Sequence, residues 1–121
     1  MNTKIILVDD QRVYKDLFRD LIGEWFDLAA VVNNYDEALV AVERLRPAAV
    51  VVDVNLEGGP GGRNGFQLAD ALLRIEPALQ IILVSAYAEP AYAHLARALP
   101  RTTFVDKAAL TSDKLKDILM P

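Results

Sequence analysis

Ile5-Ile6-Leu7-Val8-Asp9-Asp10, close to the first residue, decides the fold. Its four apolar residues run without interruption into two acids. Such a run is typical of a strand that is covered by helices on both faces and ends at a polar edge. Comparable apolar runs recur at residues 28–32, 48–52, 80–84 and 102–105. Together they predict five strands, four of which are nearly all apolar and therefore typical of strands covered on both faces.

Between these runs, apolar residues recur at helical spacing. The first such segment has an apolar stripe at steps of four residues, formed by Val13, Leu17, Leu21 and Trp25. This stripe predicts an amphipathic helix that turns it toward the core, with Phe18 and Ile22 beside it. Further helices are predicted from Asn34 to the residue before Pro47 and over residues 65–75, 90–99 and 112–119.

Five strands that alternate with five helices predict an α/β fold, because parallel neighbours need helical, right-handed crossovers. We expect a flavodoxin-like (βα)5 doubly wound sandwich with a parallel five-stranded sheet of order 2-1-3-4-5. The 121 residues contain no linker or internal repeat, so we expect one domain over residues 1–121. A glycine-rich stretch, Gly58 to Gly65, separates the third strand from the third helix.

The composition excludes several kinds of site. The chain has no Cys and one His, so a disulfide framework, a thiolate metal site and a cysteine nucleophile are ruled out. Lys and Arg number 13 against 17 Asp and Glu and form no basic run, so we expect no direct binding to nucleic acid. The first apolar run is too short for a signal peptide or a membrane span. We therefore expect no membrane association and a cytoplasmic location.

Polar residues follow the strands at one edge of the predicted sheet. The first strand ends in Asp9 and Asp10, and the third ends in Asp53. The fourth ends in Ser85, and the fifth runs into Lys107. In open α/β sheets the ligand site lies outside the carboxyl ends of the strands, at the point where the strand order reverses. We therefore expect these five side chains to converge there.

Three carboxylates in one place repel one another unless a cation lies among them. Oxygen ligands without His or Cys select Mg²⁺, which commonly also binds a phosphate oxygen. Asp53 follows a run of apolar residues that holds its backbone, which suits a nucleophile for in-line attack on phosphorus. Lys107 can neutralise a phosphoryl oxygen, and Ser85 can donate a hydrogen bond to another.

Four stretches carry a family resemblance, because they fall at strand ends in one order and separation. They are residues 5–10, 50–53, 83–86 and 104–107. In this combination the chain resembles the receiver domains of bacterial two-component response regulators over essentially all of its 121 residues.

The resemblance implies that Asp53 is the phosphoacceptor. A sensor histidine kinase or a phosphotransfer protein would supply the phosphoryl group, and a downstream effector protein or a lost output domain would respond. The implied cofactor is Mg²⁺, bound directly by Asp10 and Asp53, through water by Asp9, and by the backbone carbonyl of Asn55. The chain would not be an enzyme beyond catalysing its own phosphorylation and slow dephosphorylation.

The resemblance also implies a switch. Lys107 would act with Asp53 in catalysis, and Ser85 would move toward the phosphoryl group as the ring of Phe104 turns inward. Ala86 would leave room for that movement, and Tyr87 would control access of water. The surface formed by the fourth helix, fifth strand and fifth helix would change its binding properties as a result.

Two departures from the family pattern leave an alternative open. Glu57 stands where the family usually has Pro, and the loop that follows is about four residues longer than usual. Ala108 follows the lysine in place of Pro. The alternative is therefore a degenerate receiver that acts as a phosphorylation-independent protein interaction module. The sequence leaves the oligomeric state open.

Two other functions fit the sequence less well. A phosphohydrolase of the haloacid dehalogenase type has the motif Asp-x-Asp after its first strand, whereas Asp9 and Asp10 are adjacent in this sequence. A flavodoxin-like FMN carrier would need a phosphate loop after the first strand, where these acids would repel the phosphate.

Overall fold

In the computed structural model, residues 3–56, 64–87 and 89–120 are described, and within them five strands form one parallel sheet. The strand order is β2-β1-β3-β4-β5, as predicted. The strands are β1 (Thr3–Val8), β2 (Phe26–Val32), β3 (Ala49–Asp53), β4 (Gln80–Ser85) and β5 (Thr102–Asp106). Residues 57–63, which include Glu57 and most of the glycine-rich stretch, lie outside the described residues.

Helices connect the strands where the apolar spacing predicts them. They are α1 (Arg12–Leu21), α2 (Tyr35–Leu45), α3 (Gly65–Ile75), α4 (Pro90–Arg97) and α5 (Ser112–Leu119), with a 3₁₀ turn η1 (Lys107–Ala109) before α5. Side-chain caps fix three of the starts, and at α5 the Thr111 hydroxyl accepts from the Lys114 amide at 3.1 Å. Asn34 accepts a hydrogen bond from the Glu37 amide at 2.9 Å, and Asn64 forms a reciprocal capping box with Gln67.

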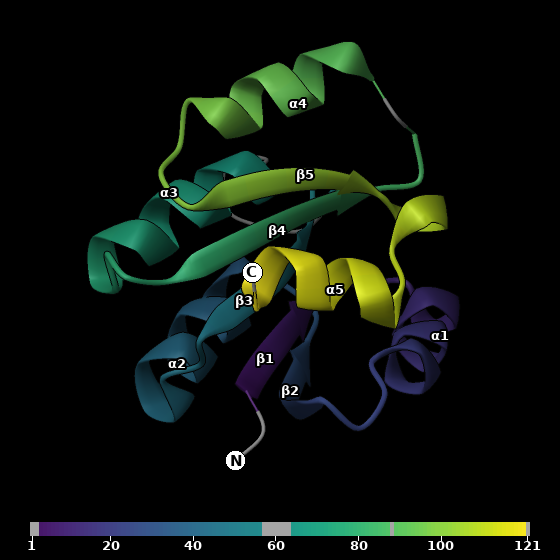
Figure 1. Cartoon of the computed structure of the whole chain (residues 1–121). Helices are drawn as coiled ribbons and strands as arrows, with labels where there is room; N and C mark the ends of the chain where they lie inside the picture. The colour runs from purple at the N-terminus through teal and green to yellow at the C-terminus, as the bar shows by residue number, and fades with distance from the viewer. Residues whose placement is uncertain (1–2, 57–63, 88, 121) are drawn as a thin grey trace.

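The central strands β1, β3 and β4 are mostly apolar because the sheet is covered on both faces (Figure 1). Ile6, Val8 and Val50 point to the side packed by α2, α3 and α4. Ile5 and Val51 point to the side packed by α1 and α5. Successive residues of a strand face opposite sides, so each of these helix layers needs its own set of apolar side chains.

The prediction of which face of the first helix packs against the sheet is wrong. Tyr14, Phe18 and Ile22 are buried, whereas Val13 and Leu17 of the predicted stripe are 82% and 54% exposed. The segment carries two neighbouring stripes at steps of four residues, and both are apolar enough to form a core face. Close packing of the whole helix face against the sheet decides which stripe is buried.

Trp25 also departs from the predicted stripe. It lies beyond the end of α1, just before β2, and it is 56% exposed. The Nζ of Lys116 on α5 lies 4.3 Å from the centroid of its ring, a distance that permits a cation–π interaction. Trp25 therefore lies at the surface against α5 and outside the core.

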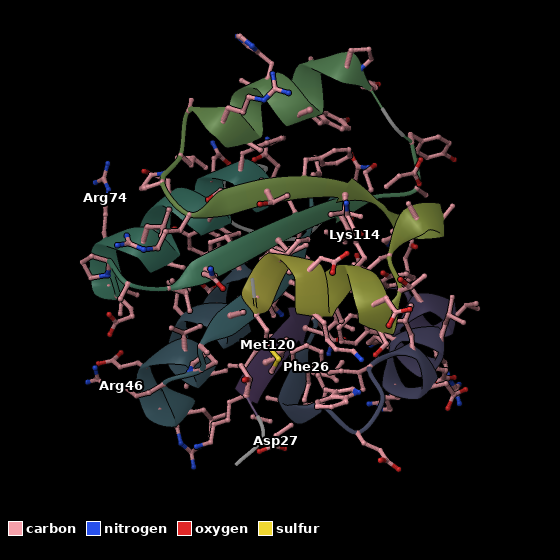
Figure 2. The ribbon with its side chains drawn as sticks, viewed as in Figure 1. Phe26, Asp27, Arg46, Arg74, Lys114 and Met120 are labelled. Atoms are coloured by element: carbon pink, nitrogen blue, oxygen red, sulfur yellow. The ribbon has the colours of Figure 1, made fainter. Side chains whose placement is uncertain are left out.

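The two ends of the sheet differ in their polar residues. Figure 2 shows the side chains of Arg46 and Arg74 projecting outward on the side of the molecule away from the arrowheads of β4 and β5 in Figure 1. Arg46, which is exposed, lies 3.7 Å from the half-buried Glu76 in an ion pair at that end. The acids that follow β1 and β3 lie at the other end, at the tips of the strands.

Among the described residues, no helix combines the length and the apolar character needed to cross a membrane.

Candidate functional site

Three acids meet where β1 and β3 end. Asp9, Asp10 and Asp53 each offer a carboxylate oxygen, and these oxygens all lie within 4.8 Å of one another. Asp9 and Asp53 are buried, whereas Asp10 is exposed. β1 and β3 are parallel neighbours with Val8 opposite Val52, so their polar ends lie side by side. The sheet register therefore creates the predicted acid cluster.

Lys107 is the cation of this cluster. Its Nζ lies 2.8 Å from Oδ2 of Asp9 and 3.3 Å from Oδ2 of Asp53, and its side chain is 8% exposed. The same Nζ donates to Oε1 of Gln11 at 3.2 Å. Lys107 begins η1 directly after β5, and Asp106 caps this turn by accepting from the Ala108 amide at 2.9 Å. The turn thus directs the lysine across the sheet toward the two acids.

Tyr14 lies beneath the lysine, an arrangement that the sequence did not reveal. The Nζ of Lys107 is 4.2 Å from the centroid of the Tyr14 ring. The Tyr14 hydroxyl is buried and has no hydrogen-bond partner among the described residues. Burial, followed by the negative charges of Asp9 and Asp53, raises the pKa of Tyr14 above its usual value of 10.0. The ring therefore offers Lys107 a neutral aromatic face.

Burial also shifts the pKa of Asp9. Its Oδ1 accepts a hydrogen bond from the Gln11 amide at 2.8 Å, and its Oδ2 pairs with Lys107. Removal from water nevertheless raises the pKa of Asp9 above 3.8, and the charge of Asp53 adds to the effect. One lysine does not balance the buried acids. Because the donors are carboxylate oxygens, the cluster fits a hard divalent cation such as Mg²⁺.

Asn55 connects Asp53 to Ser85. The backbone amide of Asn55 donates to Oδ1 of Asp53 at 2.9 Å, and its side-chain Nδ2 donates to Oγ of Ser85 at 3.2 Å. The Tyr87 amide donates to the same Oγ at 3.1 Å. Ser85 is fully buried, and its hydroxyl accepts both bonds, so its own hydrogen remains available for donation. The sequence predicted a role for the Asn55 carbonyl but not this side-chain link.

A cavity of about 430 Å³ opens onto the cluster. Six of the predicted site residues line it, namely Asp10, Asp53, Asn55, Ala86, Tyr87 and Lys107. Gln11, Glu89 and Tyr92 line it too, and no sequence signal marked them. Glu89 and Tyr92 belong to the start of α4, and only the packing of α4 against the sheet brings them to the cavity. Tyr87 is 73% exposed.

Phe104 lies apart from the acid cluster. It is half-buried on β5, and its ring centroid is 5.7 Å from that of Tyr92, which is in turn 5.7 Å from that of Phe66. Phe104 does not line the cavity, but Tyr92 does. Tyr92 therefore connects the cavity to the aromatic residue on β5.

Gly65 fixes the distance between α3 and the end of β3. Its amide donates to the Val54 carbonyl at 3.0 Å. A Cβ at this position would lie 2.3 Å from the Asp53 carbonyl oxygen and 2.8 Å from Cα of Val54. Only glycine allows the helix to begin this close to the chain that follows Asp53.

Comparison of the sequence with known proteins finds relatives among bacterial regulators. The chain is 31% identical over 94 residues to the uncharacterized transcriptional regulatory protein YesN of Bacillus subtilis, covering 74% of this chain and 24% of YesN. It is 32% identical over 87 residues to the DNA-binding response regulator MtrA of Mycobacterium tuberculosis, covering 71% of this chain and 36% of MtrA. The chain thus spans between about a quarter and about a third of these relatives.

The fold matches that of solved regulators as well. The crystal structure of a two-component response regulator of the LuxR family from Aurantimonas sp. SI85-9A1 aligns with a TM-score of 0.84 at 22% identity, covering 98% of this chain and 83% of that chain. At the level of the sequence family, residues 5–119 match the response regulator receiver domain. The protein therefore belongs to the response regulator receiver domain family of two-component systems.

Proposed function

We propose that this receiver domain is a signalling switch operated by Mg²⁺-dependent phosphorylation of Asp53. The observation that carries the proposal is the approach of Lys107 Nζ to Asp53 Oδ2, 3.3 Å away, within an acid cluster that opens to a cavity. A nucleophile, a fixed positive charge and a solvent-facing entrance are the parts that phosphoryl transfer needs.

Asp53 acts as the nucleophile. One of its carboxylate oxygens attacks the phosphorus atom of a phosphohistidine on a sensor histidine kinase or a phosphotransfer protein. The new O–P bond forms as the P–N bond breaks, and the released imidazole takes up a proton. The ammonium group of Lys107 already lies beside Asp53, so it can pair with an oxygen of the arriving phosphoryl group and offset its negative charge. The aromatic face of Tyr14 keeps the ammonium group in place.

The acid cluster would hold the metal. Asp10 and Asp53 would supply direct carboxylate ligands, Asp9 would act through water, and the Asn55 backbone carbonyl would complete the protein ligands. When bound, Mg²⁺ supplies positive charge that offsets both the carboxylates and the phosphoryl oxygens. The raised pKa of Asp9 supports this proposal, because burial and, to a smaller extent, the charge of Asp53 disfavour its ionised form, which a bound cation would stabilise.

Ser85 is the first element of the switch. Its hydroxyl accepts bonds from Asn55 and Tyr87, and it can donate its hydrogen to the phosphoryl group when the Asn55 bond is released. Ala86 is small and exposed, which leaves room for that movement. Phe104 responds through Tyr92, the residue that contacts it and also lines the cavity. Phosphorylation then shifts the population of conformations on the α4-β5-α5 surface.

The surface that changes is read by another protein or by an output domain. We propose that residues 1–121 form one domain that works in the cytoplasm, without direct contact to nucleic acid or membrane. Its chemistry is confined to its own phosphorylation and slow dephosphorylation. The net charge of −4 supports the absence of nucleic-acid contact.

Intact mass measured after incubation with acetyl phosphate and Mg²⁺ tests the proposal. We expect the gain of one phosphoryl group in the wild type, and no gain in Asp53→Asn or after chelation of the metal. Asp27→Asn, an exposed acid at the start of β2, is the matched control and should gain the group normally. If the folded wild type gains no phosphoryl group and its NMR spectrum does not change on addition of beryllofluoride with Mg²⁺, the phosphorylation-independent interaction module replaces the switch.

A further inference from the structure

Helix α2 carries a stripe that is complementary to itself. Asp36, Val40 and Arg44 follow one another at steps of four residues and therefore lie on one face of the helix. Asp36 and Arg44 are exposed, and Val40 is 58% exposed. The order acid, apolar, base becomes base, apolar, acid when the helix is reversed. Two such helices placed antiparallel would match an acid with a base at both ends.

The stripe borders an apolar groove. A hollow of about 590 Å³ lies between α2 and β2, which is an edge strand of the sheet. Its apolar lining comes from both elements: Ala30, Val32, Val40, Ala41 and Leu45. A single exposed valine on a surface needs no explanation, but a valine beside an apolar hollow with charges at both ends is typical of a contact surface.

The two charged residues of the stripe have no partner among the described residues. In the described part of the chain, neither Asp36 nor Arg44 has a hydrogen bond or an ion pair from its side chain, whereas Asp16 pairs with Arg19 on α1 at 3.2 Å. Asp36 and Arg44 are eight residues apart, too far to pair along the helix. Glu37 also lines the groove, but its carboxylate accepts from the Asn33 amide at 2.9 Å as part of the helix cap.

We propose that a second copy of this chain docks on this surface, with the two α2 helices antiparallel about a two-fold axis at Val40. Asp36 and Arg44 each lie about 6 Å along the helix axis from Val40. Antiparallel packing therefore places Asp36 of each copy beside Arg44 of the other. The two Val40 side chains meet at the axis, beside the apolar grooves of both copies, and the two helix dipoles oppose each other favourably. The interface is isologous, with the same patch used on both copies.

This interface goes beyond the proposed phosphorylation switch. The groove and the cavity at Asp53 have no lining residue in common. Failure of one proposal therefore leaves the other unaffected, since one is measured by oligomeric state and the other by mass gain.

Charge reversal on the full chain tests the proposal. Sedimentation velocity over a concentration series should show a reversible dimer for the wild type. Asp36→Arg and Arg44→Glu each replace two attractive contacts with two repulsive ones, so each variant alone should dimerise roughly tenfold more weakly. An equimolar mixture of the two variants restores both attractive contacts, because one copy is basic at both positions and the other is acidic. The mixture should therefore form a heterodimer of about wild-type affinity.

Glu43→Arg is the matched control. Glu43 is on the same helix but lines a separate hollow with Arg46 and Leu79, so this reversal should leave the dimer unchanged. All three positions are exposed, and circular dichroism verifies that each variant is folded. A wild type that stays monomeric at about millimolar concentration overturns the proposal. A dimer that tolerates both single reversals, or single variants that fail to associate when mixed, overturns it equally.

Discussion

Of the two glycines in the described residues, Gly65 has the tighter surroundings. Alanine at this position would bring a Cβ within 2.3 Å of the Asp53 carbonyl oxygen, and that oxygen belongs to a strand fixed within the sheet. Relief requires α3 to move away from β3. We expect Gly65→Ala to lower the free energy of unfolding by roughly 2–3 kcal/mol, measured by urea denaturation.

Gly23 provides the comparison for that measurement. Its φ is +68°, and its Cβ would meet the Oγ of Ser112 at 3.2 Å, an atom on a side chain that can rotate. Gly23→Ala should therefore lower the free energy of unfolding by only about 1 kcal/mol, mainly because alanine is disfavoured in the left-handed backbone conformation. Equal losses in the two variants would contradict the steric explanation for Gly65.

The raised pKa of Asp9 predicts a specific pH dependence of stability. Between 3.8 and the raised pKa, the native state binds more protons at Asp9 than the unfolded state does. The contribution of Asp9 to stability therefore falls as the pH rises through this interval and stays constant above it. Asp9→Asn removes the buried charge, so in the absence of metal we expect this variant to be more stable than the wild type at pH values above the interval.

Urea denaturation as a function of pH measures this difference. The difference in the free energy of unfolding between Asp9→Asn and the wild type should grow as the pH rises above 3.8 and then become constant. Asp27→Asn, which changes an exposed acid, serves as the control and should show no such widening. A wild type that is more stable than Asp9→Asn above the interval would show that Lys107 outweighs the burial of Asp9.

At the scale of elements, α1 shows which of two stripes is structural. Phe18 is fully buried, whereas Leu17 beside it is 54% exposed. Phe18→Ala should lower the free energy of unfolding by about 3–5 kcal/mol, because it leaves a cavity against the sheet. Leu17→Ala should change it by no more than about 0.5 kcal/mol. Thermal and urea denaturation of the two variants measure the difference.

The reverse result would restore the stripe predicted from the sequence. A larger loss in Leu17→Ala than in Phe18→Ala would mean that α1 turns Val13 and Leu17 toward the sheet. The two variants are adjacent and both become Ala, so helix propensity changes little between them.

At the scale of the whole molecule, metal binding at the strand tips should stabilise the fold. The proposed ligands come from the ends of β1 and β3 and meet only in the native state, so binding favours that state by mass action. At a Mg²⁺ concentration 100 times the dissociation constant, stability should rise by about 2.7 kcal/mol. A shift of the thermal midpoint with Mg²⁺ measures the effect.

Asp10→Asn should abolish that shift while leaving the metal-free midpoint close to that of the wild type. Asp10 is exposed, so its replacement removes a proposed ligand without opening a cavity in the core. Ca²⁺ in place of Mg²⁺ shows how far the cluster discriminates by size. An unchanged Mg²⁺ shift in Asp10→Asn would exclude this carboxylate from the ligands.

The sequence by itself determined the order of strands and helices, and it placed the strands and most helices to within about two residues of their ends. Continuous apolar runs identify strands covered on both faces, and Asn34 marks a helix start because its side chain caps free amides. The acids after β1 and β3 were also predictable, because parallel strands place their carboxyl ends at one edge. These features depend on local chemistry and on a topology with few alternatives.

Only the tertiary structure decided which side chains complete the site and which stripe of α1 is buried. Tyr14 beneath Lys107, the Asn55 amide on Ser85, and Tyr92 at the cavity wall join elements that are distant in the sequence. The orientation of each helix about its own axis sets these contacts. That orientation comes from close packing of whole faces against the sheet, which the spacing of residues along one segment does not contain.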